Sequence, residues 1–190
     1  VLLTVQVASA QLHTPYRFPA DEPGGGGGGG FRCGTTIRTN LVLPNDIVNC
    51  PGNGVIINGN NVVLDCQGHI ISGTGTGSGV SASGRRNIIV RNCVIQNFNT
   101  GINFSSTNSS QMISNTLLSN FRGAQIRSSS KDTVSGNKVS GSGNIGLYIL
   151  TSSGNTIISN TVNICFYGIY VVSSANNTLK NNTVSASSLD

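Results

Sequence analysis

The stretch GLYILTSSGNTIISNTVNICFYGIYVVSS, residues 146–174, decides the fold, because it contains one short pattern twice at a distance of 22 residues. Gly146 opens the first copy and Gly168 the second. In each copy an apolar residue follows the glycine, another stands two positions later, and a tyrosine separates them. This alternation is typical of a short strand with two inward residues and one outward residue.

The same step continues through most of the chain. Glycines open the segments at Gly79, Gly101, Gly123, Gly146 and Gly168, with spacings of 22, 22, 23 and 22, and Gly54 opens a longer copy 25 residues earlier. Two further apolar columns are Ile89, Met112, Val134, Ile157 and Leu179, and Val94, Leu117, Val139, Val162 and Val184. An asparagine column stands between them: Asn92, Asn115, Asn137, Asn160 and Asn182.

These columns favour an all-β solenoid over a helical repeat. A two-helix repeat needs a longer unit and a period of 3.6, whereas apolar residues here recur every two or three positions. A coil of about six turns, with 22–23 residues per turn, satisfies every column and buries an apolar face that one turn could not bury alone. We expect the asparagines to form a structural amide ladder at a bend, and the glycines to meet either a positive φ or close packing.

Two segments resemble a known family. NTIISNTVNICFYGIYVVSSANNTLKNNTV, residues 155–184, and NNVVLDCQGHIISG, residues 60–73, are similar to the right-handed parallel β-helix repeats of NosD-like and carbohydrate-associated proteins. The resemblance covers about residues 33–190. It implies a right-handed parallel β-helix, a fold that supports lyases, hydrolases, binding modules and inert scaffolds, so it does not imply one function.

The chain divides into four parts. Residues 54–190 form the β-helix, 31–53 an N-terminal capping segment, 24–30 a linker of consecutive glycines, and 1–23 an extended arm or a signal remnant. Near the start, Leu3, Val5 and Val7 alternate with polar or small residues, which is a strand pattern suited to an assembly arm. The alternative is the tail of a secretory signal, in which residues 8–10, Ala-Ser-Ala, form the cleavage site.

The five cysteines lead to different expectations for an oxidising and for a reducing compartment. For a secreted protein we expect disulfides between Cys33 and Cys50 and between Cys66 and Cys93, with Cys165 unpaired. In a reducing compartment all five would be small buried apolar residues instead.

Composition narrows the function classes. Charged residues make up 9% of the chain, and the net charge is +5. The cations are scattered and lack interleaved aromatic residues, so we do not expect a nucleic-acid partner. No apolar run reaches the length of a membrane span.

Catalytic and metal chemistry have few candidate residues. Within the repeats only Asp65 and Asp132 precede the terminal aspartate, and they lie three turns apart, too far for a pair of catalytic carboxyl groups. Copper would need several His, Met or Cys ligands, but His13, His69 and Met112 are the only His and Met residues. We expect His69 to be a packed or capping residue, Met112 to be core, and the protein to have no catalytic residues, metal or cofactor.

Two surface features suggest partners. Four N-x-S/T sequons mark Asn103, Asn108, Asn176 and Asn181 as acceptors for covalent glycans at outward positions. Tyr148 and Tyr170 are outward residues on neighbouring turns and could stack on sugar rings of a polysaccharide.

The leading functional hypothesis is a secreted, non-catalytic, glycosylated structural protein. The last turn has no sequence typical of a cap, so we expect head-to-tail stacking of copies into an extracellular filament, helped by the N-terminal strand. Two alternatives remain: a carbohydrate-binding cell-surface module, and a polysaccharide lyase or hydrolase truncated before its active turns.

Overall fold

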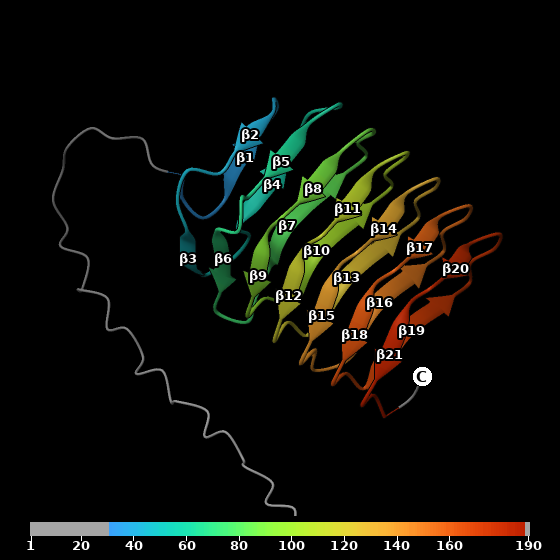
Figure 1. Ribbon diagram of the computed structural model, residues 1–190. Coiled ribbons are helices and arrows are strands. Elements are labelled where there is room, and N and C mark those ends of the chain that lie inside the picture. Colours follow the sequence, from blue (N-terminus) through green and yellow to red (C-terminus); the bar gives the residue numbers. More distant parts are fainter. Residues whose placement is uncertain (1–30, 189–190) are drawn as a thin grey trace, which may run out of the picture.

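Each copy of the repeat folds into three short strands joined by bends, and successive copies stack as turns of a right-handed parallel β-helix. The computed structural model describes residues 31–188. Figure 1 shows the turns side by side along one axis. The all-β parallel solenoid predicted from the repeat is therefore confirmed, with seven turns rather than about six.

Three parallel sheets of seven strands each run along the coil. Sheet A contains β1 (Thr35–Ile37), β4 (Val55–Ile57), β7 (Ser78–Ser83), β10 (Thr100–Ser105), β13 (Arg122–Arg127), β16 (Ile145–Leu150) and β19 (Tyr167–Val172). Sheet B contains β2 (Leu41–Val42), β5 (Val63–Asp65), β8 (Ile89–Arg91), β11 (Gln111–Ile113), β14 (Thr133–Ser135), β17 (Thr156–Ile158) and β20 (Thr178–Lys180). Sheet C contains β3 (Ile47–Cys50), β6 (Ile70–Gly73), β9 (Val94–Gln96), β12 (Thr116–Leu118), β15 (Lys138–Ser140), β18 (Thr161–Asn163) and β21 (Thr183–Ser185).

The extra turn comes from the segment that we expected to be only a cap. Residues 31–53 supply β1, β2 and β3, the first strand of each sheet. The strands of this turn are short, and its spacing to the next turn is irregular: Thr35 pairs with Val55, 20 residues later, whereas Ile47 pairs with Ile71, 24 residues later. This irregular spacing is why the glycine step did not reveal the turn. The arm with Leu3, Val5 and Val7 and the linker 24–30 lie outside the described residues. Within residues 31–188 no helical segment has the length and apolar character to cross a bilayer.

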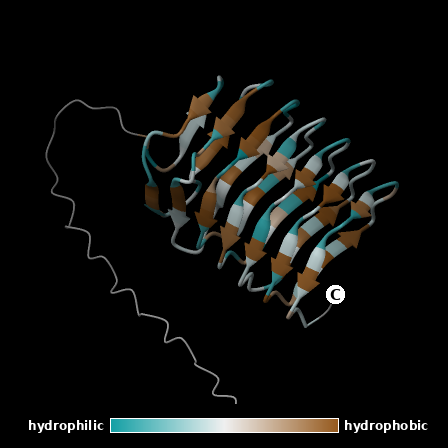
Figure 2. Ribbon diagram, in the orientation of Figure 1, coloured by the Kyte–Doolittle hydropathy of each residue, from teal (hydrophilic) through white to brown (hydrophobic). Residues whose placement is uncertain are grey.

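The core is built from residues that stack on their equivalents one turn away. Ile102 pairs with Val80 on one side and Ala124 on the other, and all three are buried. Met112 is also buried, as predicted. Figure 2 shows hydrophobic residues mainly on the strands and more hydrophilic residues at the bends. Each turn thus covers the apolar face of its neighbours, as a solenoid requires.

Close packing, rather than a positive φ, explains the glycine column. A Cβ on Gly123 would lie 2.4 Å from Val139 Cγ1 and 2.5 Å from the carbonyl oxygen of Gly146. Gly146 is crowded in the same way by Val162 and by the carbonyl oxygen of Gly168, and Gly168 is crowded by Val184 of its own turn. Any side chain at these positions would push adjacent turns apart.

An asparagine ladder holds the bend between sheets B and C. The Oδ1 of Asn137 accepts a 2.9 Å hydrogen bond from the backbone N–H of Asn115, and its Nδ2 donates to Asn160 Oδ1 and to the carbonyl of Met112, each at 2.9 Å. Asn182 continues the ladder by accepting from the Asn160 backbone N–H at 3.0 Å. The buried amides satisfy backbone groups that the bend leaves outside the sheets.

Asn92 is not part of this ladder, so its assignment from the sequence was wrong by one residue. The ladder position in that turn is Cys93, whose backbone N–H donates to Asn115 Oδ1 at 3.1 Å. Asn92 is exposed, with a φ of 54°, in the preceding bend position, where Ser114 and Asn181 have similar φ values.

The one-residue shift that displaces Asn92 also displaces the inward apolar residues of the two neighbouring strands. Val90 pairs with Met112 and Ile95 pairs with Leu117, where the sequence favoured Ile89 and Val94. A shift of one residue exchanges the inner and outer faces of a strand, but neighbouring apolar residues hide it in the sequence.

A second ladder occupies the bend between sheets A and B and was not predicted. Ser110 N–H donates to Asp132 Oδ1, Asp132 N–H donates to Asn155 Oδ1, and Asn155 N–H donates to Asn177 Oδ1, at 2.8, 2.8 and 2.9 Å. The change of residue type from turn to turn concealed this column in the sequence.

The cysteines pair as expected for an oxidising compartment. Disulfides join Cys33 to Cys50 and Cys66 to Cys93, while Cys165 is free and buried. The second disulfide links consecutive turns at the bend where the asparagine ladder begins. Covalent bonds therefore reinforce the first turns of the coil, and side-chain ladders the later ones.

Candidate binding groove on the outer face of sheet A

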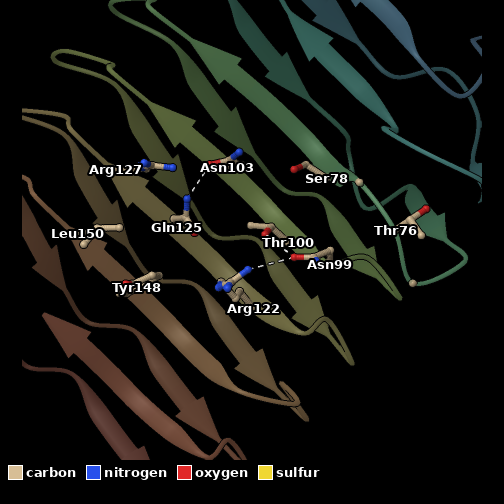
Figure 3. Close-up of a pocket in the computed structure, with 12 residues that line it drawn as sticks. Thr76, Ser78, Asn99, Thr100, Asn103, Arg122, Gln125, Arg127, Tyr148 and Leu150 are labelled. Atoms are coloured by element: carbon tan, nitrogen blue, oxygen red, sulfur yellow. Dashed lines mark hydrogen bonds between the residues drawn. The ribbon is translucent and has the colours of Figure 1, made fainter. Parts of the chain in front are cut away.

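An open depression of about 550 Å³ lies on the outer face of sheet A. It extends from the bend before β7, across β10 and β13, to β16. Figure 3 shows the polar side chains that converge on it. Its lining residues are Gly75, Thr76, Gly77, Ser78, Asn99, Thr100, Asn103, Arg122, Gln125, Arg127, Tyr148 and Leu150.

The bend between β6 and β7 forms one end of this groove. Gly75 and Gly77 both have positive φ values, 95° and 63°, which a residue with a side chain would adopt only under strain. The Thr76 hydroxyl donates to the carbonyl of Pro51 at 2.7 Å. These contacts fix the raised loop against the preceding turn.

Two amide side chains form the floor. Asn103 on β10 and Gln125 on β13 are register partners, and the Gln125 Nε2 donates to Asn103 Oδ1 at 3.3 Å. Both side chains are half-buried. They leave amide donors and acceptors facing outward, which suits hydrogen bonding to hydroxyl groups.

Two arginines flank the floor on the same strand. Figure 3 shows Arg122 and Arg127 on either side of Gln125. The Arg122 Nη1 donates to Asn99 Oδ1 at 3.1 Å, and its guanidinium carbon lies 5.1 Å from the centre of the Phe121 ring. These contacts hold the guanidinium group of Arg122 in place, while Arg127 is exposed.

Tyrosines form the other end of the groove. Tyr148 on β16 and Tyr170 on β19 are register partners on one face, as the repeat indicated. Their rings stack on each other, with centres 5.7 Å apart and planes 13° apart, and Tyr170 also stacks on Tyr167 at 4.9 Å. Because the two rings cover part of each other, they do not form a side-by-side platform for sugars. Tyr148 is the tyrosine that lines the groove.

The two aspartates near the bend between sheets B and C lie elsewhere. Asp65 ends β5 and accepts a 2.9 Å hydrogen bond from Arg91 Nε, so these two residues form an ion pair. Burial tends to raise the pKa of Asp65, but the Gln67 N–H, the Asn92 amide and Arg91 outweigh it and hold that pKa below its usual value. This ion pair is structural.

Asp46 has a similar structural role. It accepts from the Ile70 N–H at 2.9 Å and lies 2.9 Å from His69 Nδ1. The Ile70 N–H, with a smaller contribution from His69, lowers the pKa of Asp46. Asp46 thus caps the Ile70 N–H, and the His69 side chain packs against that carboxylate.

Asp132 is buried inside the second ladder. Burial raises the pKa of this carboxyl group, although the Thr107 hydroxyl and the Ser110 N–H oppose the shift. It lies three strand positions along sheet B from Asp65, as the repeat predicted.

The described residues do not fit a copper site. Residues 31–188 contain no group of three or more His, Cys, Asp or Glu side chains that could hold a metal ion. Met112 is buried in the core, four cysteines are in disulfides, and His69 is engaged by Asp46. His13 lies outside the described residues.

The four sequon asparagines differ in accessibility. Asn108, Asn176 and Asn181 are exposed at bends, and the last two have φ values of 55° and 54°. Asn103 is half-buried on the groove floor. Glycosylation of these residues stays a prediction.

The three-sheet coil and its polar outer groove define a right-handed parallel β-helix repeat protein. Residues 33–190 match the family described as "Periplasmic copper-binding protein (NosD)", so the chain belongs to the NosD family. No curated protein matches the chain.

Two similar solved structures are of the periplasmic alginate epimerase AlgG. For a point mutant of AlgG the TM-score is 0.67 with 15% identity, over 78% of this chain and 41% of that one. For AlgG itself the TM-score is 0.61 with 16% identity, over 80% of this chain and 44% of that one. This chain therefore spans less than half the length of either structure, and at such identity the likeness concerns the fold.

The groove was only partly visible in the sequence. Asn103, Gln125 and Tyr148 each stand two positions after the glycine that opens their repeat, so the repeat itself places all three on the outer face. Arg122 and Arg127 belong to the cations that look scattered in the sequence. The sequence does place these two arginines at the two ends of the strand that carries Gln125. Only the stacked register shows that strand to be the centre of a groove.

Proposed function

We propose that this protein is a non-catalytic polysaccharide-binding β-helix, and that the groove on sheet A is its binding surface. The observation that carries this proposal is the convergence of Asn103, Gln125, Arg122 and Tyr148 on one open depression. Carbohydrate recognition requires hydrogen-bonding groups aimed at hydroxyls, together with an aromatic surface against the sugar ring.

The dimensions of the groove support a chain-like ligand. The groove crosses the strands from β7 to β16, and three steps between neighbouring strands amount to about 14 Å. It is open to solvent, so an extended polymer can lie across it without being enclosed. A polysaccharide satisfies both conditions.

The non-catalytic part of the proposal rests on the carboxyl groups. Hydrolysis of glycosides generally uses two carboxyl groups a few ångströms apart. Among residues 31–188, Asp46, Asp65 and Asp132 are engaged at bends, and none of them lines the groove. We therefore propose binding without cleavage.

We also propose that the protein is located outside the cytoplasm. Two disulfides are typical of oxidising compartments. The NosD family description and the AlgG structures both carry the word periplasmic. Secretion to the periplasm or the extracellular space is consistent with both observations.

A pair of glutamines tests the binding site. Gln125 and Gln111 both face outward, on sheets A and B respectively. We expect Gln125→Ala and Tyr148→Ala to weaken binding to a polysaccharide panel by about tenfold each, and Gln111→Ala to leave it unchanged. Equal effects of the two glutamine variants would contradict the groove. Shortening of the bound polysaccharide during incubation would contradict the non-catalytic role.

Head-to-tail stacking into a filament is the second candidate. Val171 and Leu179 are 37% and 48% exposed, although their register partners Ile149 and Ile157 are buried. A second copy stacked on this face, like a further turn of the coil, would bury both residues and pair the strands of the last described turn. Electron microscopy of the concentrated protein tests this candidate: filaments would support it, and monomers alone would contradict it.

A glycan on Asn103 conflicts with the proposed groove. Asn103 lies on the groove floor, so an attached glycan would occupy the ligand site. Glycans on Asn108, Asn176 and Asn181 would leave the groove open. We therefore expect mass spectrometry of the secreted protein to find Asn103 unmodified, and an occupied Asn103 would contradict polysaccharide binding there.

A further inference from the structure

We infer that the groove on sheet A selects an anionic polysaccharide, one that carries carboxylate or sulfate groups along its chain. This inference rests on the proposed function and names the ligand class of the same site. Its basis is the distribution of charge around the groove. Arg122 and Arg127 are the charged residues that line the groove.

The described acidic residues are all withdrawn from this face. Asp65 is paired with Arg91 and Asp46 with His69, both near the bend between sheets B and C. Asp132 lies in the A–B bend but is 1% exposed. The two groove arginines therefore have no carboxylate partner among residues 31–188. Their charge is available to a ligand.

Arg122 is held in a fixed position before any ligand arrives. Asn99 accepts one of its N–H bonds, and the Phe121 ring lies beneath its guanidinium group. Its Nε is buried and has no hydrogen-bond partner in the protein. The Nε is out of reach of solvent, so an anionic ligand would bind the terminal nitrogens of this guanidinium group.

The placement of the two arginines matches a linear polyanion. They stand on either side of Gln125, five residues apart on one strand, a separation of roughly 16 Å. A sugar chain that runs along the coil axis over Gln125 passes between them. If successive sugar units face opposite sides of the polysaccharide, their charged groups point alternately toward one arginine and toward the other. Each group can bind an anion through two parallel hydrogen bonds.

Matched ligands test the inference by calorimetry. The probes are a uronic acid oligosaccharide, the same oligosaccharide with its carboxyl groups reduced to alcohols, and a sulfated oligosaccharide. We expect one or both anionic probes to bind at least tenfold more tightly than the reduced probe, with an affinity that falls as salt increases. The two anionic probes distinguish carboxylate from sulfate.

Substitutions test whether the preference for anionic probes comes from the groove arginines. Arg122→Gln and Arg127→Gln should each lower the affinity for the preferred anionic probe about tenfold and lower the affinity for the reduced probe by a clearly smaller factor. Lys138→Gln, which removes the same charge from an exposed site on sheet C, is the control and should change neither affinity. An equal loss in Lys138→Gln would overturn the inference, because binding would then follow net charge alone.

The outcomes separate the two proposals. If the reduced probe binds as tightly as the anionic probes, and Gln125→Ala weakens both, then the groove binds polysaccharide without selecting charge and this inference fails alone. If none of these probes and no polysaccharide of the panel binds, the proposed function fails with it.

Discussion

Adjacent turns of this coil are joined at the bend between sheets B and C by a disulfide in the early part of the coil and by side-chain hydrogen bonds in the later part. At the bend between sheets B and C, Cys66 and Cys93 are joined by a disulfide, whereas Asn115, Asn137 and Asn160 continue the same column by hydrogen bonds. A disulfide joins one pair of turns permanently and depends on the compartment. An amide ladder can be extended turn after turn and does not depend on redox conditions.

The candidate groove crosses the junction of these two regions. Its raised end, residues 75–77, belongs to the disulfide-reinforced turns, and Arg122 and Tyr148 belong to the ladder-held turns. The geometry of the site therefore depends on both means of stabilisation.

Removal of the disulfide should have the largest effect on stability. We expect Cys66→Ser combined with Cys93→Ser to lower the free energy of unfolding by about 3 kcal/mol, because the bond closes a loop of 27 residues. Urea unfolding followed by circular dichroism measures this loss. Cys165→Ser is the control, since Ser142 and Ser187 occupy the equivalent position in adjacent turns. A wild-type stability that does not change with reductant would contradict the prediction.

Loss of one ladder asparagine should have the next largest effect. Asn137→Ala leaves the Asn115 N–H without its acceptor and removes the amide bond to the Met112 carbonyl, which should cost about 2–3 kcal/mol in unfolding free energy. Asn92→Gly is the matched control, because Asn92 is exposed and outside the ladder and glycine adopts its φ of 54° without strain, so it should cost less than about 1 kcal/mol. Similar losses in both variants would place Asn92 back in the ladder.

A substitution at an exposed bend should stabilise the later turns. Ile164 has a φ of 53° and is 62% exposed, a strained conformation for a β-branched residue that buries little surface. Ile164→Asn should raise the free energy of unfolding by about 1 kcal/mol. Val42→Asn, at an exposed strand position, is the control and should bring no gain. Thermal unfolding of both variants checks the difference, and destabilisation of Ile164→Asn would count against backbone strain.

The smallest effect is a dependence on pH. The pKa of Asp132 is raised in the folded protein, so its contribution to stability is fully present below the unfolded pKa and is lost as pH rises through the folded value. Asp132→Asn should remove this loss, because asparagine occupies the next position of the same ladder. Asp46 and Asp65, whose pKa values are lowered, act in the opposite direction but are common to both proteins. The unfolding free energy of the wild type minus that of the variant should therefore fall from acidic to neutral pH. Identical slopes would contradict the prediction.

The sequence predicted the coil because a solenoid repeats its physical constraints at a constant interval. Gly123, Gly146 and Gly168 meet the same crowding in each turn, so the residue type itself is repeated. The ladder that contains Asp132 was missed because serine, aspartate and asparagine can each supply the acceptor oxygen. The residue type therefore varies while the contact is constant.

The groove was harder to predict than the coil. Its two ends come from different turns, and its arginines act together only because β13 lies between β10 and β16. The Asn92 error has the same origin, since the sequence could not show which of two adjacent residues points inward. Both the groove and the place of Asn92 depend on which residues pair between neighbouring strands, and the amino-acid composition does not show this pairing.

The central claim is that the outer face of sheet A binds polysaccharide. Backbone amide chemical shifts of the isotope-labelled protein, followed while an anionic oligosaccharide is added, test it most directly. We predict that shifts concentrate at outward residues of β7, β10, β13 and β16, with Gln125 and Arg122 among the largest. Shifts confined to sheets B and C or to the last described turn, or no shifts at all, would contradict the claim.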